Sequence, residues 1–178
     1  MITGDTKFHI TNEKLKEISD RQISESISTG RISPDDAALI TEFLQELRAV
    51  SQISLGRFYK LQCLLVAWRD NIPEYRSLDT SAVFSAIETI KTIKGNTGGP
   101  KYSPSTQTDY IKTLKRFLSW MSENGYANSN LNLAKIAKVK SPGYKTTKTA
   151  EMMLTPHEIK DLIEAATNLR DKLLISLL

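Results

Sequence analysis

The chain has 178 residues, of which 40% are hydrophobic and 25% charged, a composition typical of a globular protein with one domain and part of another. Its longest run of aliphatic and aromatic residues, Leu64 to Trp68, has five residues, whereas a membrane-spanning helix needs about 20. The N-terminus lacks the basic start and apolar core of a secretory signal, and the single cysteine, Cys63, excludes an internal disulfide and a cysteine-clustered zinc site. We therefore expect a soluble, cytoplasmic protein without a membrane partner.

The net charge of +4 is unevenly distributed along the sequence. Residues 96–150 contain nine Lys and Arg residues but only two acidic residues, Asp109 and Glu123, which gives this segment a charge of +7. The segments on either side, 1–95 and 151–178, carry −1 and −2. A basic block in a nearly neutral chain favours an anionic partner, most often nucleic acid, although a solvated lysine-rich surface or linker has the same composition.

Helical periodicity dominates, and no repeat of 20–50 residues is visible. The spacing of apolar residues and the turn signals between them predict five long helices, over about 12–28, 33–50, 54–71, 79–93 and 103–124. Ser33 and Pro34 are a clear helix start, and Gly30 and Gly125 end the first and fifth helices.

The fifth of these helices has two distinct faces. One carries the apolar stripe Tyr110, Leu114, Phe117, Leu118 and Met121. The opposite face carries hydroxyl and cationic side chains and no acidic residue before Glu123; its members are Ser105, Thr108, Lys112, Lys115, Arg116 and Ser119. A helix with such a face can enter the major groove of DNA, and we expect Lys112 and Lys115 to contribute to binding but not to stability. An ordinary solvated helix face is the alternative.

The C-terminal third predicts a short helix over 131–139 and an exposed basic linker over 140–150. A new helix then starts at Thr155, for which Glu158 completes a capping box. The last helix stops in the middle of its apolar pattern, so we expect that a second domain has been cut off.

The sequence contains no catalytic constellation. His9 and His157 lie in unrelated settings, and Cys63 interrupts a helix face as a small apolar residue would. The glycines at 95, 98 and 99 lack the strand before and helix after that a phosphate-binding loop requires. No metal and no cofactor is expected.

Four segments of the chain, taken in their order and spacing, are similar to segments of a known protein family. They are GRISPDDAALITEFLQEL, SLGRFYKLQCLLVAWRDNI, YSPSTQTDYIKTLKRFLSWMSENGY and LTPHEIKDLIEAATNLRDKLLISLL. From Ser33 to Leu178 the chain resembles the N-terminal part of tyrosine recombinases, the phage-integrase family, and most closely their archaeal-type members. The first three segments are similar to helices of the core-binding domain. The fourth is similar to the start of the catalytic domain, including its Asn168-Leu169-Arg170-Asp171 bend. Residues 1–30 are not covered.

This resemblance implies an all-α fold. The expected organisation is an extra N-terminal helix in residues 1–30, a SAM-like helical core-binding domain over 31–139, a basic linker over 140–150 and the first helices of a truncated catalytic domain over 151–178.

The resemblance also implies that the core-binding domain forms half of a clamp around duplex DNA. The second and fourth core-binding helices would face the major groove, and the linker would follow the DNA backbone. Combined with the face analysis, this predicts the following DNA-contacting residues: Arg57, Lys60, Lys101, Ser103, Ser105, Thr106, Thr108, Lys112, Lys115, Arg116, Lys140, Lys145 and Lys148.

The family's catalytic residues, a tyrosine nucleophile with two arginines, a lysine and a histidine or tryptophan, belong to the catalytic domain. None of the six tyrosines matches the nucleophile's position, and Arg170 belongs to the bend, so we expect the fragment to lack catalytic residues and activity. The parent protein would be a site-specific recombinase that self-associates on double-stranded DNA, up to a tetramer. Two alternatives remain: a stand-alone DNA-binding regulator or accessory factor, and a helical protein-interaction module. An arginine soon after Leu178 and a late tyrosine in the full reading frame would separate the first alternative from a recombinase, and absence of duplex binding would favour the second.

Overall fold

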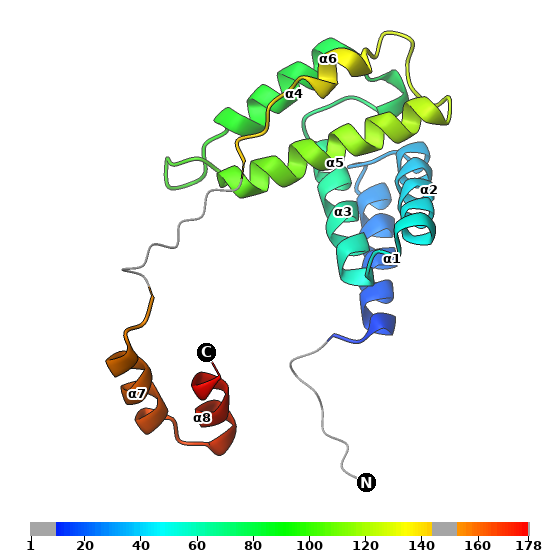
Figure 1. Cartoon of the computed structure of the whole chain (residues 1–178). Helices are drawn as coiled ribbons and strands as arrows, with labels where there is room; N and C mark the ends of the chain where they lie inside the picture. The colour runs from blue at the N-terminus through cyan, green and yellow to red at the C-terminus, as the bar shows by residue number, and fades with distance from the viewer. Residues whose placement is uncertain (1–9, 144–152, 178) are drawn as a thin grey trace. The chain divides into compact units, whose positions relative to one another are not determined.

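The computed structural model of the chain describes residues 10–143 and 153–177 (Figure 1). These residues form helices and contain no strand, only one isolated bridge between Lys94 and Pro100. The helices are α1 Asn12–Ser28, α2 Pro34–Ser51, α3 Leu55–Trp68, the 3-10 turn η1 Tyr75–Ser77, α4 Thr80–Thr92, α5 Pro104–Glu123, α6 Leu133–Ala137, α7 Pro156–Ala165 and α8 Leu169–Ser176. The prediction of an all-α fold is confirmed.

The chain divides into two compact units, the first ending at Gly143 and the second beginning at Tyr144. Helices α1 to α6 belong to the first unit, and α7 and α8 to the second. Within the first unit α1 packs against α3 and α2. The second unit is a helical hairpin of α7 and α8.

The helix starts follow the local sequence signals. Ser33 accepts a hydrogen bond from the backbone N–H of Asp36, whose carboxylate in turn accepts from the Ser33 N–H, so that a complete capping box opens α2. The predicted box of Thr155 and Glu158 opens α7 in the same way. At the end of α5, Gly125 has φ +74°, a conformation that glycine adopts without strain.

Helix α5 is the central element of the first unit. Figure 1 shows it between two groups of helices, α1 to α3 on one side and α4 with α6 on the other. Ten of its 20 residues are buried. The predicted apolar stripe from Tyr110 to Met121 is among them, so the face analysis of this helix is confirmed for its core side.

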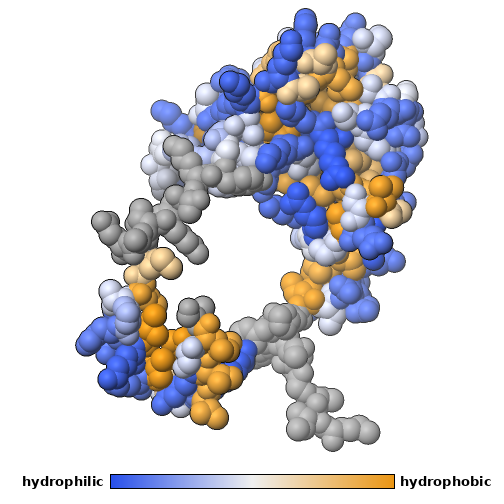
Figure 2. All heavy atoms as spheres, in the orientation of Figure 1, coloured by the Kyte–Doolittle hydropathy of each residue, from blue (hydrophilic) through white to orange (hydrophobic). Residues whose placement is uncertain are grey.

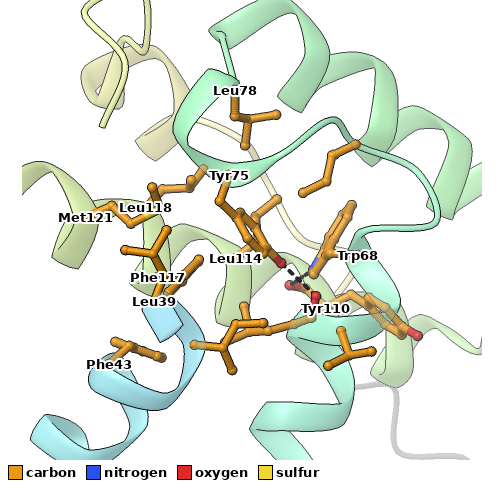
Figure 3. Packing of buried hydrophobic residues seen from close by; sticks show 14 of the residues in the cluster. Leu39, Phe43, Trp68, Tyr75, Leu78, Tyr110, Leu114, Phe117, Leu118 and Met121 are labelled. Carbon is orange, nitrogen blue, oxygen red and sulfur yellow. Dashed lines mark hydrogen bonds between the residues drawn. The ribbon is translucent and has the colours of Figure 1, made fainter. Parts of the chain in front are cut away.

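The core around α5 is rich in aromatic residues (Figure 3). The ring of Phe117 lies edge-on to Tyr75, with centroids 4.7 Å apart, and to Phe43, at 5.2 Å. The indole of Trp68 donates a hydrogen bond to the carbonyl oxygen of Tyr110 over 3.1 Å. Edge-to-face packing of this kind fixes both the distance and the orientation of α2, α3 and α5.

A buried carboxylate connects α2 with the end of α3. Asp36 is 1% exposed and accepts hydrogen bonds from the Tyr75 backbone N–H, at 3.0 Å, and from the Arg69 guanidinium. Arg69 also donates to the carbonyl oxygen of Ile72. Because a buried charge is tolerated only when paired and hydrogen-bonded, this cluster fixes the chain path between α3 and η1.

We predict that Phe117→Ala lowers the free energy of unfolding by about 3–5 kcal/mol, because the ring is fully buried and its removal leaves a cavity among the aromatic residues. Urea denaturation followed by circular dichroism measures this loss. The matched control is Phe84→Ala on α4, where the ring is 40% exposed and the loss should be much smaller. Equal losses in the two variants would contradict the packing described here.

Candidate nucleic-acid interface

Two predicted contact residues lie near the start of α3. Ser54 caps this helix by accepting a hydrogen bond from the Arg57 backbone N–H, which leaves the Arg57 side chain exposed. Lys60, one turn further, is also exposed, and its ammonium group donates to Asp109 Oδ2 on α5 over 2.6 Å. The two helices that were predicted to face DNA are thus joined by an ion pair.

The hydroxyl groups predicted at the start of α5 take part in its cap. Ser103 Oγ accepts a hydrogen bond from the Thr106 backbone N–H, and the two side-chain oxygens lie 2.9 Å apart. Ser105, between them, is half-buried. Lys101 precedes the cap and is exposed, with its ammonium group 5.3 Å from the centre of the Tyr102 ring.

The prediction that Thr108 projects into solvent is wrong. Its side chain is fully buried, and its hydroxyl donates to the carbonyl oxygen of Gly143 over 3.3 Å. The chain that follows α6 returns along α5 and covers this side of the helix (Figure 1). Thr108 is therefore not available for DNA.

Lys115 faces the same returning chain. Its ammonium group donates to the carbonyl oxygens of Ala137, at 2.7 Å, and Val139, at 3.1 Å. These carbonyls lie at the end of α6, where helical carbonyl groups have no partner of their own. Because the side chain links the end of α6 to α5, we now expect Lys115 to contribute to stability, contrary to the expectation from the sequence.

Arg116 lies on the other side of α5, next to the end of α2. Its guanidinium is 3.5 Å from Ser51 Oγ, and it lines a groove of about 220 Å³ together with Glu46, Glu123 and Trp120. Glu46 accepts a hydrogen bond from the Trp120 indole N–H over 2.7 Å. Two carboxylates at this groove offset the positive charge of Arg116, so it is a weaker candidate for a phosphate contact than the sequence indicates.

The sequence-based statement that no acidic residue interrupts the polar face of α5 before Glu123 is also wrong. Asp109 lies one turn from both Ser105 and Lys112, and its carboxylate reaches Lys60 across the helix crossing. The residue was visible in the sequence as one of only two acids in the basic segment. Helical spacing alone places it on that face, and the structure adds its ion pair with α3.

The exposed and partly exposed polar side chains near this ion pair form one surface, which we call the α3–α5 surface. It consists of Arg57, Lys60, Ser105, Asp109 and Lys112. Figure 2 shows hydrophilic side chains gathered where α5 crosses α3. Lys140, in the chain after α6, is exposed, whereas Lys145 and Lys148 lie outside the described residues.

Neither a metal-ligand cluster nor an activated tyrosine hydroxyl is seen at the positions considered next, all within the part of the chain that the structure describes. It contains no group of three or more His, Cys, Asp or Glu side chains that could hold a metal ion. The Tyr75 hydroxyl donates to the Leu65 carbonyl oxygen over 2.7 Å, and burial raises its pKa well above the ordinary value. Burial also raises the pKa of Tyr110. Both hydroxyls are thereby kept protonated and are poor nucleophiles.

Among the same residues, no helix is both long and apolar enough to span a bilayer. No protein-family model, curated protein or solved structure matches the chain.

We predict that Lys115→Ala lowers the free energy of unfolding by about 1 kcal/mol, because two carbonyl groups lose a charged hydrogen-bond donor. Lys112→Ala, on the exposed part of the same helix, is the matched control and should have a smaller effect. Thermal and urea denaturation of the two variants provide the comparison. If Lys112→Ala proved the more destabilising, the assignment of Lys115 to the α6 contact would be contradicted.

Proposed function

We propose that the first unit binds duplex DNA through the α3–α5 surface, as the core-binding half of the clamp of a site-specific tyrosine recombinase. The observation that carries this proposal is that Lys60 on α3 pairs with Asp109 on α5, one turn from the exposed Lys112, so that cations of two different helices lie near one helix crossing. If the face of α5 that carries Lys112 were only a solvated helix face, there would be no need for a second helix with Arg57 and Lys60 to lie beside it.

The α3–α5 surface is suited to binding DNA because the backbones of α3 and α5 are held in fixed positions relative to each other. Trp68 and Tyr110 join the same two helices in the core, while Lys60 and Asp109 join them at the surface. A rigid pair of helices can present Ser105 and Lys112 to a groove and Arg57 to a neighbouring phosphate without losing backbone conformational freedom on binding.

Three of the residues that the sequence predicts to contact DNA are less favoured as DNA contacts in this proposal. Thr108 is buried, Lys115 is bound to α6 carbonyl groups, and Arg116 lies beside carboxylates. Arg57, Lys60, Lys101, Lys112 and Lys140 remain as the exposed cations, and phosphate contacts from them would supply the sequence-independent part of the affinity.

We predict that the chain binds a mixed-sequence duplex with an affinity that falls steeply as salt rises, with a log–log slope of about −0.9 per phosphate neutralised. Fluorescence anisotropy at several salt concentrations measures the slope. Lys112→Ala should weaken binding and reduce the magnitude of the slope by about one unit.

The matched control for this titration is Lys91→Ala, which removes one positive charge from α4, a helix without predicted contacts. It should bind nearly as the unchanged chain does. A titration independent of salt, or equal effects of the two substitutions, would contradict the proposal, and absence of duplex binding would favour a protein-interaction module.

The recombinase part of the proposal concerns the parent protein, which would cleave DNA with a tyrosine of its catalytic domain and assemble on its recombination site in the cytoplasm. For this chain we predict duplex binding without a covalent adduct, even on a nicked substrate that traps a tyrosyl intermediate. Denaturing electrophoresis detects such an adduct. An adduct that disappears in one Tyr→Phe variant of this chain would contradict the assignment of its tyrosines to non-catalytic positions.

A further inference from the structure

Asp109 is the one carboxylate of the α3–α5 surface. Its side chain is 19% exposed, and Ser105 and Lys112 are its neighbours on the same face of α5. Across the helix crossing, Lys60 is 52% exposed and donates to Asp109 Oδ2 over 2.6 Å. A hydrogen-bond acceptor and a donor of opposite charge are thus held side by side at the centre of the surface.

A surface that bound only phosphates would be hindered by this carboxylate, because the negative charge repels the DNA backbone. Its ion pair with Lys60 adds little to stability, since half-exposed pairs contribute only weakly. The hydrogen bond and the ring contact between Trp68 and Tyr110 already hold the helices of this crossing in place. A carboxylate at this position is explained when a base edge, and not a phosphate, lies opposite it.

We propose that Asp109 and Lys60 together read a C·G base pair in the major groove, an inference that rests on the proposed DNA-binding function. Asp109 accepts a hydrogen bond from the cytosine N4 amino group, and the Lys60 ammonium donates to O6 and N7 of the paired guanine. The ion pair of the free protein is exchanged for these two contacts, so that both charges keep a partner in the complex.

The arrangement of donors and acceptors in the groove gives this pair its selectivity. In a C·G pair the amino donor lies at one end of the base-pair edge, with both acceptors on the same side of it. In a T·A pair the adenine amino group lies between two acceptors, N7 and the thymine O4, so a carboxylate there faces lone pairs on both sides. The pair of Asp109 and Lys60 therefore favours C·G, by roughly five- to 150-fold at that position.

Substitution of Asp109 changes the base that is preferred. Asn donates and accepts, and its amide pairs with N6 and N7 of adenine. In D109N the preference at the position should therefore shift from cytosine to adenine, and in D109A it should weaken to the part that Lys60 supplies through the paired guanine. Both variants should bind an arbitrary duplex more tightly than the unchanged chain, because the repulsion of phosphates is removed.

The test is a selection from duplexes with a randomised segment of about two helical turns, performed with the full chain, D109N and D109A. The matched control is D35N, which removes a carboxylate from the exposed pair of Asp35 and Arg76 on α2 and η1. The expected result is one position with cytosine in the unchanged chain and in D35N, with adenine in D109N and with a weaker preference for cytosine in D109A.

The same position with the same preference in all four proteins would overturn the inference, and so would duplex binding without any sequence preference. Both results leave the proposed function intact. Failure of every protein to retain any duplex would instead contradict the proposed function. Circular dichroism of each variant establishes that it is folded before the selection.

Discussion

The burial of α5 between two groups of helices is the constraint on which the remaining features of the first unit depend. Phe117 and the residues around it hold the helix against α2, α3 and η1, and the returning chain after α6 covers a further side. On the side that faces α3, Lys112 is exposed and Ser105 is half-buried. The candidate interface is therefore as well fixed as the core itself, because the same helix belongs to both.

Polar side chains of this unit serve the fold before they are available to a ligand. Ser103 caps α5, Lys115 donates to a carbonyl oxygen at the end of α6, and Asp36 accepts the hydrogen bond that joins α2 to η1. A count of basic residues in the segment consequently overestimates the charge that can meet a phosphate. Lys60 and Lys112 are better candidates because they lie at an exposed helix crossing.

Much of the fold can be predicted from local sequence, because caps, glycine stops and apolar spacing act within one helix. The bounds of α1, the capped starts of α2 and α7 and the core stripe of α5 agree with the structure. The errors at Thr108 and Lys115 have one physical cause, whereas helical spacing alone already places Asp109 on the polar face. Helical periodicity describes how a helix presents its side chains, but it does not include the chain after α6, whose position depends on contacts distant in sequence.

The central claim, that the α3–α5 surface contacts duplex DNA, is tested most directly by following the backbone amide resonances of the chain in NMR spectra while a duplex is added. Our account predicts that the largest shifts fall on the start of α3, around Arg57 and Lys60, and on α5 from Ser105 to Lys112. Smaller shifts are expected on α4. Shifts confined to α4 or to the groove of Arg116 and Glu46, or the absence of any shift, would contradict it.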